Sequence, residues 1–231
     1  MIFHAVRPLA AVRLRLAVAV GQLVLAAALL APASAVAERP IRIIAFGDSL
    51  VAGYRLPNGE AFPAQLQKAL QNKGYPVEVV ASGVSGDTTG AGLARIDWAL
   101  ADSADAVILE LGANDALRGI DPAVTRRNLE AIIERIEAKG AKILLAGMKA
   151  PRNWGSEYVK KFEAIYPELA DKHRLVLYPF FLEGVALDPA LILDDGLHPN
   201  AKGVARIVAG ILPSVEKLIA EIEAGRRAAG R

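Results

Sequence analysis

The sequence contains no cysteine among its 231 residues. This absence excludes a disulfide framework, a zinc site built on thiolates, a cysteine nucleophile and a lipid-modified N-terminal cysteine. The composition is 53% hydrophobic and 23% charged, which excludes a disordered or fibrous chain. A chain of this length can bury a substantial core without disulfides or bound metal.

An excess of basic residues is also missing from most of the chain. The formal net charge is +2, but residues 1–37 contribute Arg7, Arg13 and Arg15 and no acidic residue. Without them, 24 basic residues face 25 acidic ones, a net charge of −1. A nearly neutral body without a basic stripe argues against nucleic acid as a partner.

Residues 1–37 have the pattern of a secretory signal peptide. The three arginines precede an apolar run at 16–30, and small residues follow at 31–37. We expect cleavage after Ala35 or Ala37, which leaves a hydrolase domain at 38–231. A retained anchor is the alternative, although the run is short for a hydrocarbon core of ~30 Å. No second apolar run is long enough to span a membrane, so we expect a soluble, monomeric protein that is periplasmic or secreted.

Strand and helix patterns alternate along the body of the chain. Short apolar runs predict strands at 41–46, 77–81, 106–111, 143–146 and 175–177. Helical spacing predicts helices at 62–73, 88–100, 122–139, 156–172 and 199–224. We expect Thr88 or Thr89 and Asp121 to cap helices, and Pro167 and Pro213 to bend or interrupt them. The alternation predicts one α/β domain, a parallel sheet with helices on both faces.

Polar segments follow the predicted strands at the places where such a sheet carries its sites. Ligands of open parallel sheets bind in the crevice beyond the carboxyl ends of the strands. Residues 47–49, 85–87 and 112–115 follow the first three predicted strands, and residues 195–198 precede the last helix. These four segments are therefore the candidates for a catalytic site.

A serine, a histidine and an aspartate among these residues suit nucleophilic catalysis. Ser49 needs a base to take its proton, and histidine is the usual one. Of the three histidines, His4 leaves with the signal peptide, and we expect His173 to be a solvated cation at a helix end. His198 remains at the working edge, with Asp195 close enough to orient it. Taken alone, each of these residues also suits a helix cap or a turn.

The other polar segments offer groups that can hold an oxyanion. Two or three fixed N–H donors, each worth ~3 kcal/mol, stabilise a tetrahedral intermediate. The backbone N–H groups of Ser49 and Gly86 and the amide of Asn114 can supply them, and Asp48 can brace the turn at Ser49. The convergence of four separate loops favours catalysis over four independent structural roles.

The same four segments resemble the conserved blocks of the GDSL or SGNH hydrolases. Gly47-Asp48-Ser49-Leu50 is similar to their first block, and residues 85–88, 112–115 and 195–199 are similar to the later blocks, in the same order. Residues 150–167 and 194–200 resemble the periplasmic group of acyl-CoA thioesterase I, lysophospholipase and arylesterase. Members of that group often have Asn-Ala where this chain has Ala81-Ser82, which could change how the second loop is braced.

This resemblance implies a flavodoxin-like three-layer α/β/α sandwich with a five-stranded parallel sheet. It also implies a triad of Ser49, Asp195 and His198, an oxyanion hole of Ser49, Gly86 and Asn114, and no metal or other cofactor. A lipase-type elbow is absent, because valine occupies position 51 where Gly-x-Ser-x-Gly requires glycine.

The substrate is expected to be a small acyl ester or thioester. Trp154 and Tyr158 follow the fourth predicted strand, where they could line an acyl or aryl pocket, whereas Phe162 is expected to pack in the core. Two alternatives remain open at the level of sequence. One is a carbohydrate O-acetylesterase with the same triad, and the other is a non-catalytic periplasmic binding protein.

Overall fold

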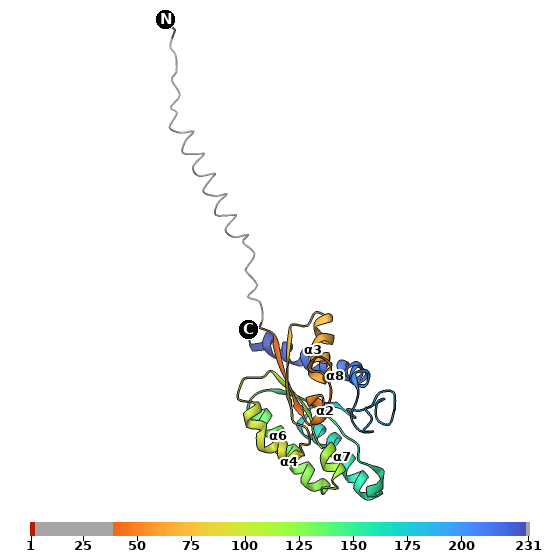
Figure 1. The fold of residues 1–231 in the computed structure, drawn as a ribbon. Coiled ribbons are helices and arrows are strands. Elements are labelled where there is room, and N and C mark those ends of the chain that lie inside the picture. The colour runs from red at the N-terminus through yellow and green to blue at the C-terminus, as the bar shows by residue number, and fades with distance from the viewer. Residues whose placement is uncertain (3–38, 230–231) are drawn as a thin grey trace. The chain divides into compact units, whose positions relative to one another are not determined.

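Five short apolar runs form a single sheet of parallel strands in the computed structural model, which describes residues 1–2 and 39–229 (Figure 1). The sheet order is β2-β1-β3-β4-β5. The strands are β1 (Ile41–Gly47), β2 (Val77–Gly83), β3 (Ala106–Glu110), β4 (Lys142–Ala146) and β5 (Val176–Tyr178). The predicted signal peptide at 1–37 lies almost wholly outside the described residues.

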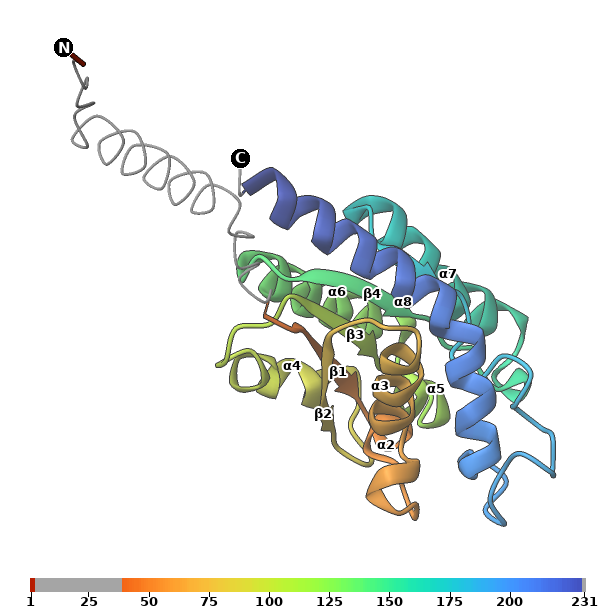
Figure 2. The ribbon, with the colours of Figure 1, turned by 90° about the horizontal axis from the view of Figure 1, so that it is seen from above.

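Helices cover both faces of the sheet, as the alternating pattern predicts. On one face, α4 (Thr89–Ala99) packs against α6 (Pro122–Ala138), which packs against α7 (Ser156–His173). On the other face, α3 (Phe62–Asn72) packs against α8 (Ala201–Ala229). Figures 1 and 2 show these two layers on either side of the strands. The predicted three-layer α/β/α fold is confirmed.

The core lies between these layers and explains why the strand runs were recognisable. Every residue of β3 is buried, and β1 is buried except for Arg42. Strands that are covered on both faces carry continuous apolar runs rather than an alternating pattern. α6 buries Leu129, Ile132, Ile133 and Ile136, which share one helical face.

The strand order reverses at β1, because β2 lies on one side of it and β3 on the other, and such a point is where open parallel sheets bind ligands. Gly47 at the end of β1 pairs with Gly83 of β2 and with Glu110 of β3. The carboxyl ends of the three strands therefore finish level with one another. Two short helices, α2 (Ser49–Ala52) and α5 (Ala113–Leu117), begin just beyond the ends of β1 and β3.

The two internal prolines do not interrupt their helices. α7 is a single helix with Pro167 inside it, and α8 is a single helix with Pro213 inside it. An interior proline costs ~3 kcal/mol, whereas each large apolar side chain that is buried contributes ~1.5–3 kcal/mol. α8 buries a full stripe of apolar residues that outweighs the proline: Val204, Ile207, Val208, Ile211, Val215, Leu218, Ile219 and Ile222.

The predicted helix caps are confirmed. The Thr88 hydroxyl accepts a hydrogen bond from the N–H of Ala91 at 3.3 Å, at the start of α4. The Asp121 carboxylate accepts one from the N–H of Ala123 at 2.8 Å, at the start of α6. These side chains satisfy backbone donors that have no partner within the first helical turn.

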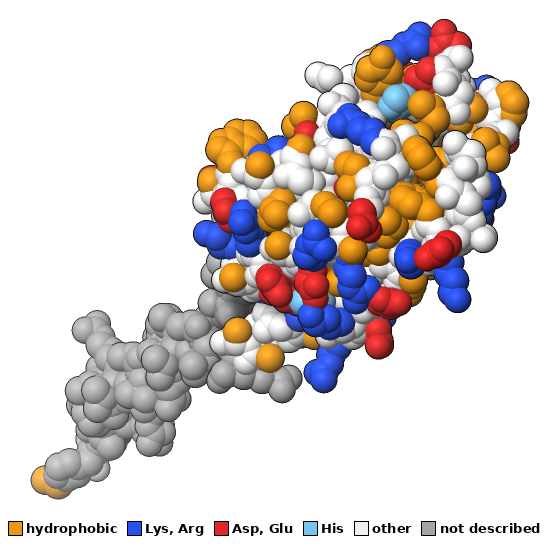
Figure 3. All heavy atoms as spheres, turned by 90° about the horizontal axis from the view of Figure 1, so that it is seen from below, with side chains coloured by type: hydrophobic (Ala, Val, Ile, Leu, Met, Phe, Trp, Pro, Cys, Tyr) orange, Lys and Arg blue, Asp and Glu red, His pale blue; other side chains and the backbone are white. Residues whose placement is uncertain are grey.

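Charged side chains of both signs are interspersed on the face that Figure 3 shows. This distribution agrees with the nearly equal numbers of acidic and basic residues in the body of the chain. Among the residues that the structure describes, none of the helices is long and apolar enough to cross a membrane.

Candidate active site

The turn after β1 fixes the proposed nucleophile at the edge of the sheet. Asp48 caps α2 by accepting a hydrogen bond from the N–H of Leu50 at 3.0 Å, as predicted. Ser49 is the first residue of this helix and is 8% exposed. Gly83 allows the close approach of β2, because a Cβ there would lie 2.3 Å from the backbone nitrogen of Ala52.

A closed loop carries His198 to the same edge. Asn200 donates hydrogen bonds from its amide to the carbonyls of Ala190 (3.0 Å) and Ile192 (3.3 Å). Its side-chain oxygen accepts from the N–H of Gly203 at 3.1 Å, in the first turn of α8. Asn200 therefore closes the loop and caps the helix, so that α8 begins two residues later than the predicted position 199.

Asp195, His198 and Ser49 form one continuous hydrogen-bonded row. Asp195 Oδ1 accepts from the N–H groups of Leu197 (2.9 Å) and His198 (3.0 Å). Asp195 Oδ2 lies 2.8 Å from His198 Nδ1, and His198 Nε2 lies 2.8 Å from Ser49 Oγ. The backbone N–H of His198 is the largest cause that lowers the pKa of Asp195 to about 2. A carboxylate with this pKa stays ionised over the working range of a histidine base.

Two residues that the sequence analysis did not single out pack against the histidine loop. The ring centroids of Tyr54 and His198 are 4.4 Å apart, with planes inclined by 37°. Arg55 forms an ion pair of 2.6 Å with Asp194, the residue before Asp195. Neither contact has a signal in the sequence, because residues 54–55 and 194–198 meet only in the folded chain.

The three predicted oxyanion donors lie on neighbouring loops. Gly86 has φ +88°, a conformation that favours glycine. Within the described residues, neither Ser49 N–H nor Gly86 N–H donates a hydrogen bond to the protein. The amide of Asn114 donates to Asp48 Oδ2 at 2.9 Å, which leaves its second hydrogen available. Arg118 donates to the carbonyl of Gly86 at 2.9 Å and so links the second and third loops.

Two carboxyl groups are fully buried beneath the nucleophile turn. Asp48 and Glu110 are both 0% exposed, and the N–H of Asp48 donates to Glu110 Oε2 at 3.3 Å. Glu110 Oε1 has no hydrogen-bond partner among the described residues. Burial raises the pKa of Asp48 to about 6. Burial, and then the charge of Asp48, raise the pKa of Glu110 well above its ordinary value. The sequence contains one sign of this pair, because Glu110 is an acidic residue at the end of the otherwise apolar run at 106–110.

The two residues predicted to bind substrate pack beside the helix that carries Asn114. The Tyr158 hydroxyl donates to the carbonyl of Ile120 at 2.8 Å. The Trp154 ring covers Gly119, where a Cβ would lie 2.6 Å from a ring carbon. Trp154 is 43% exposed, whereas Phe162 is fully buried, so the prediction that Phe162 belongs to the core is confirmed.

His173 lies at the end of α7, as expected, but it is not exposed to solvent as the sequence suggested. Its side chain is only 10% exposed, and its Nδ1 lies 3.1 Å from a carboxylate oxygen of Glu137. It therefore links α7 to α6 on the helical face and takes no part in the site at the sheet edge.

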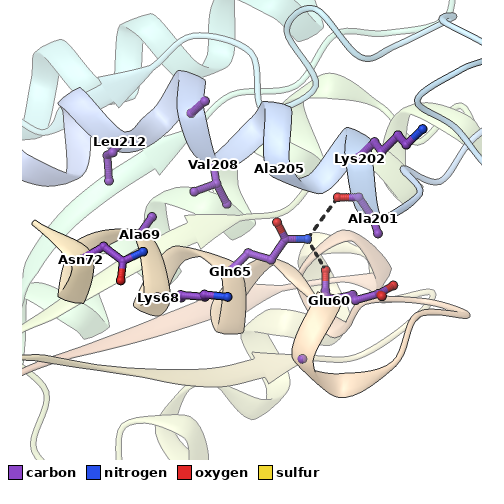
Figure 4. Close-up of a pocket in the computed structure, with 12 residues that line it drawn as sticks. Glu60, Gln65, Lys68, Ala69, Asn72, Ala201, Lys202, Ala205, Val208 and Leu212 are labelled. Atoms are coloured by element: carbon purple, nitrogen blue, oxygen red, sulfur yellow. Dashed lines mark hydrogen bonds between the residues drawn. The ribbon is translucent and has the colours of Figure 1, made fainter.

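A groove of about 610 Å³ lies away from these residues, between α3 and α8 (Figure 4). The amide of Gln65 crosses it, donating to the carbonyls of Glu60 (2.8 Å) and Ala201 (3.1 Å). None of the predicted site residues lines this groove. Gln65 instead fixes the first residue of α8, and with it the end of the histidine loop, against α3.

Comparison with known proteins decides the family. The profile of the GDSL-like lipase/acylhydrolase family matches residues 45–206, which include all the predicted catalytic residues. The chain belongs to the GDSL-like lipase/acylhydrolase family. It is accordingly a serine carboxylic ester hydrolase, as the sequence predicts.

Three known members show how much of the chain shares this family's structure. An arylesterase of Vibrio mimicus is 42% identical over 72% of this chain and 84% of its own length. The thioesterase 1/protease 1/lysophospholipase L1 of Escherichia coli K12 is 42% identical over 68% of this chain and 75% of its own length. AlinE4, an SGNH-hydrolase family esterase of known crystal structure, is 47% identical in sequence. Its structure matches 78% of this chain and 96% of its own chain, with a TM-score of 0.67.

Proposed function

We propose that this GDSL hydrolase cleaves carboxylic esters or thioesters, with Ser49 as nucleophile, His198 as general base and Asp195 as the group that orients the imidazole. The observation that carries the proposal is the row of hydrogen bonds from Asp195 Oδ2 to Ser49 Oγ, in which both links to the imidazole are 2.8 Å. A hydroxyl within this distance of an imidazole can pass on its proton as it attacks.

Acylation follows from this geometry. Ser49 Oγ forms a bond to the substrate carbonyl carbon as His198 Nε2 takes its proton, and Asp195 stabilises the resulting imidazolium. The negative oxygen of the tetrahedral intermediate is held by the N–H groups of Ser49 and Gly86 and the amide of Asn114. When the intermediate collapses, the bond to the leaving group breaks, and His198 protonates the departing alcohol or thiol.

Deacylation repeats these steps with water. His198 takes a proton from a water molecule, whose oxygen bonds to the acyl carbon and again creates an oxyanion in the same donors. Collapse breaks the bond to Ser49, and the proton returns to its oxygen. The products are a carboxylic acid and the free enzyme.

The substrate class is supported by the relatives and by the aromatic residues near α5. The named relatives are an arylesterase and a thioesterase/lysophospholipase, which both act on acyl groups bound to oxygen or sulfur. Trp154 and Tyr158 are proposed to border the acyl or aryl group, with Trp154 presenting its exposed ring. A chain-length series of p-nitrophenyl esters and acyl-CoAs should show a preference that Trp154→Ala flattens.

Export is proposed as well, because the small residues at 31–37 follow an apolar run. The mature domain would begin near Glu38 and act in the periplasm or outside the cell as a monomer. The intact mass of the protein from the periplasmic fraction, together with its elution on size exclusion, tests both points. A full-length mass in that fraction would contradict cleavage.

Labelling with a fluorophosphonate probe tests the catalytic assignment. The wild-type protein should be modified stoichiometrically, and peptide mapping should place the adduct on Ser49. Ser49→Ala should lose both labelling and hydrolysis of p-nitrophenyl esters while its thermal unfolding stays unchanged. Turnover by purified Ser49→Ala at the wild-type rate would end the proposal.

A further inference from the structure

One arginine on α4 contacts three elements that converge beneath the proposed oxyanion donors. Arg95 Nε donates to Asp87 Oδ2 at 2.6 Å, and Nη2 donates to the carbonyl of Gly47 at 2.8 Å. Nη1 donates to both the carbonyl and the hydroxyl of Ser82, at 3.1 and 3.2 Å. The guanidinium carbon also lies 4.0 Å from the ring centroid of Phe46. All three nitrogens are therefore engaged, and the planar group is held from below by an aromatic face.

The acceptors of Arg95 lie next to the groups proposed to bind the oxyanion. Gly47 stands two residues before Ser49, and Asp87 directly follows Gly86. The carbonyl of Gly47 also accepts from the N–H of Val84 at 3.1 Å, so the two loops touch at this point. The guanidinium therefore bridges the end of β1 and the loop that follows β2.

The arrangement is shielded from water and geometrically specific. The side chains of Arg95 and Asp87 are 18% and 11% exposed, so their ion pair is little screened by solvent. A guanidinium presents its donors in a rigid fork, whereas a lysine ammonium is a compact charge on a flexible stem. Lysine could keep the charge at this position, but its three N–H donors on one nitrogen could not reach all four acceptors.

Ser82 extends this arrangement at the end of β2. The Ser82 hydroxyl supplies a fourth acceptor for Arg95. The outer side of the same loop is held by Arg118, which donates to the Gly86 carbonyl. Arg95 therefore fixes the loop from the interior and Arg118 from the surface.

We propose that Arg95 is a positioning residue that sets the spacing of the Ser49 and Gly86 N–H groups for the developing oxyanion. This inference rests on the proposed function of the same site. Because these donors act on the tetrahedral state and not on the ground-state ester, loss of Arg95 lowers kcat and leaves KM nearly unchanged. The Ser49–His198–Asp195 row has no direct contact with Arg95, so the pH profile of kcat keeps its shape.

Arg95→Met tests the proposal, with Arg135→Met as the matched control. Arg135 also joins a helix to α4, by donating to the carbonyl of Leu93 and to Asp97, but it lies away from the site. For Arg95→Met we expect kcat to fall about 100-fold, the loss typical of donors displaced by about 1 Å. The affinity for a trifluoromethyl ketone, whose adduct carries an oxyanion, should fall by a similar factor. Arg135→Met should match the wild type in both measurements.

Two milder variants keep the test decisive if Arg95→Met does not fold. Arg95→Lys should recover less than a tenth of the lost kcat, because it keeps the charge without the fork. Asp87→Asn keeps the shape of the acceptor and should lower kcat about tenfold, again without changing KM.

The outcomes separate the inference from the function on which it rests. Wild-type kcat in folded Arg95→Met or Asp87→Asn, a loss confined to KM, or an unchanged ketone affinity would overturn the positioning role while Ser49→Ala remained inactive. Hydrolysis by Ser49→Ala at the wild-type rate would instead overturn the proposed function, and the positioning role with it.

Discussion

The two ends of the sheet carry the same kind of arginine–aspartate cluster in different surroundings. At the amino end, Asp105 Oδ2 accepts from the N–H of Arg42 and from Arg226 Nη2, both at 2.9 Å. At the carboxyl end, Arg95 binds Asp87 and the loops that present Ser49. The first cluster joins β1 and the start of β3 to the last turns of α8. The second joins the two loops that are proposed to hold the oxyanion. The location of such a cluster, more than its chemistry, should decide whether its loss costs stability or turnover.

Asp195→Asn should give the largest effect at the carboxyl end. An amide can still accept the N–H bonds of Leu197 and His198, but it cannot stabilise the imidazolium or fix its tautomer. We expect kcat for p-nitrophenyl esters to fall about 10⁴-fold. Asp188→Asn is the control, since Asp188 makes a similar turn to the N–H of Ala190 at 2.9 Å without a histidine. A loss of less than tenfold in Asp195→Asn would argue against Asp195 as the group that orients the imidazole.

Asn114→Ala should give the next largest effect. Removing one oxyanion donor typically lowers kcat by about 10²–10³-fold, with little change in KM. Asn128→Ala is the control. It removes an amide on α6 that donates to Thr89 of α4 at 3.1 Å, and it should retain the wild-type kcat. If the two variants turned over at equal rates in steady-state assays, the third predicted donor would have to be sought elsewhere.

The features that the sequence predicted are those with a local cause. The strands at 41–47 and 106–110 were predictable because burial on both faces demands an unbroken apolar run. His198 could be selected because few histidines compete for the role and because its loop precedes the last helix. The prolines at 167 and 213 do not interrupt their helices, because the local penalty of a proline is smaller than the packing energy of the whole helix, which a local pattern does not show.

The features that the sequence did not predict depend on tertiary register. Arg95 has no spacing that marks it, since its acceptors lie 8, 13 and 48 positions away along the chain. The ring contact between Tyr54 and His198 likewise joins segments that are far apart in sequence. Glu110 was visible as a charge in an apolar run, but only the sheet register places it under Asp48.

Glu110→Gln should change how stability depends on pH. A raised pKa means that the folded state binds the proton more tightly than the unfolded chain. The stabilisation from protonated Glu110 is thus complete below the unfolded pKa, near 4.5, and is lost as the pH rises toward the folded pKa. The stabilisation from protonated Asp48 is likewise lost as the pH rises from its ordinary pKa of 3.8 toward its folded pKa of about 6. Burial raises the pKa of Asp48, and the backbone N–H of Leu50, then the amide of Asn114 and the nearby His198, oppose this rise.

Denaturant unfolding at several pH values measures this effect. Glutamine stays neutral, so Glu110→Gln should be more stable than the wild type at pH 8, and the difference should shrink toward pH 5. Glu137→Gln is the control, because it alters a carboxylate on α6 and keeps Glu110. Its free energy of unfolding should change more steeply between pH 5 and pH 8 than that of Glu110→Gln. A difference for Glu110→Gln that stayed constant with pH would show that the pKa of Glu110 is the same in the folded and unfolded states.

At the amino end, Arg226→Met should cost stability and leave catalysis intact. A hydrogen bond to a charged partner contributes about 1.5–3 kcal/mol, and this pair is 19% and 9% exposed. We expect the free energy of unfolding to fall by about 1–2 kcal/mol and kcat to stay within about twofold of the wild type. Within the described residues, the neighbouring Arg227 makes a single ion pair, an exposed contact of 3.7 Å with Glu223, so Arg227→Met should change neither quantity. A large loss of kcat in Arg226→Met would erase the contrast between the two ends.

Tyr54→Leu should lower kcat the least of the substitutions at the carboxyl end of the sheet. It should leave stability unchanged, in contrast to Arg226→Met at the amino end. The Tyr54 ring lies 4.4 Å from that of His198, and an aromatic face favours the imidazolium that forms in the transition state. An aromatic pair contributes about 0.5–1.5 kcal/mol, so we expect kcat to fall about three- to tenfold. Tyr54→Phe keeps the ring and should turn over at nearly the wild-type rate. Since Tyr54 is 41% exposed, neither change should lower thermal stability appreciably. Equal rates for the leucine and phenylalanine variants would mean that the ring only covers the histidine loop and does not assist the charge on it.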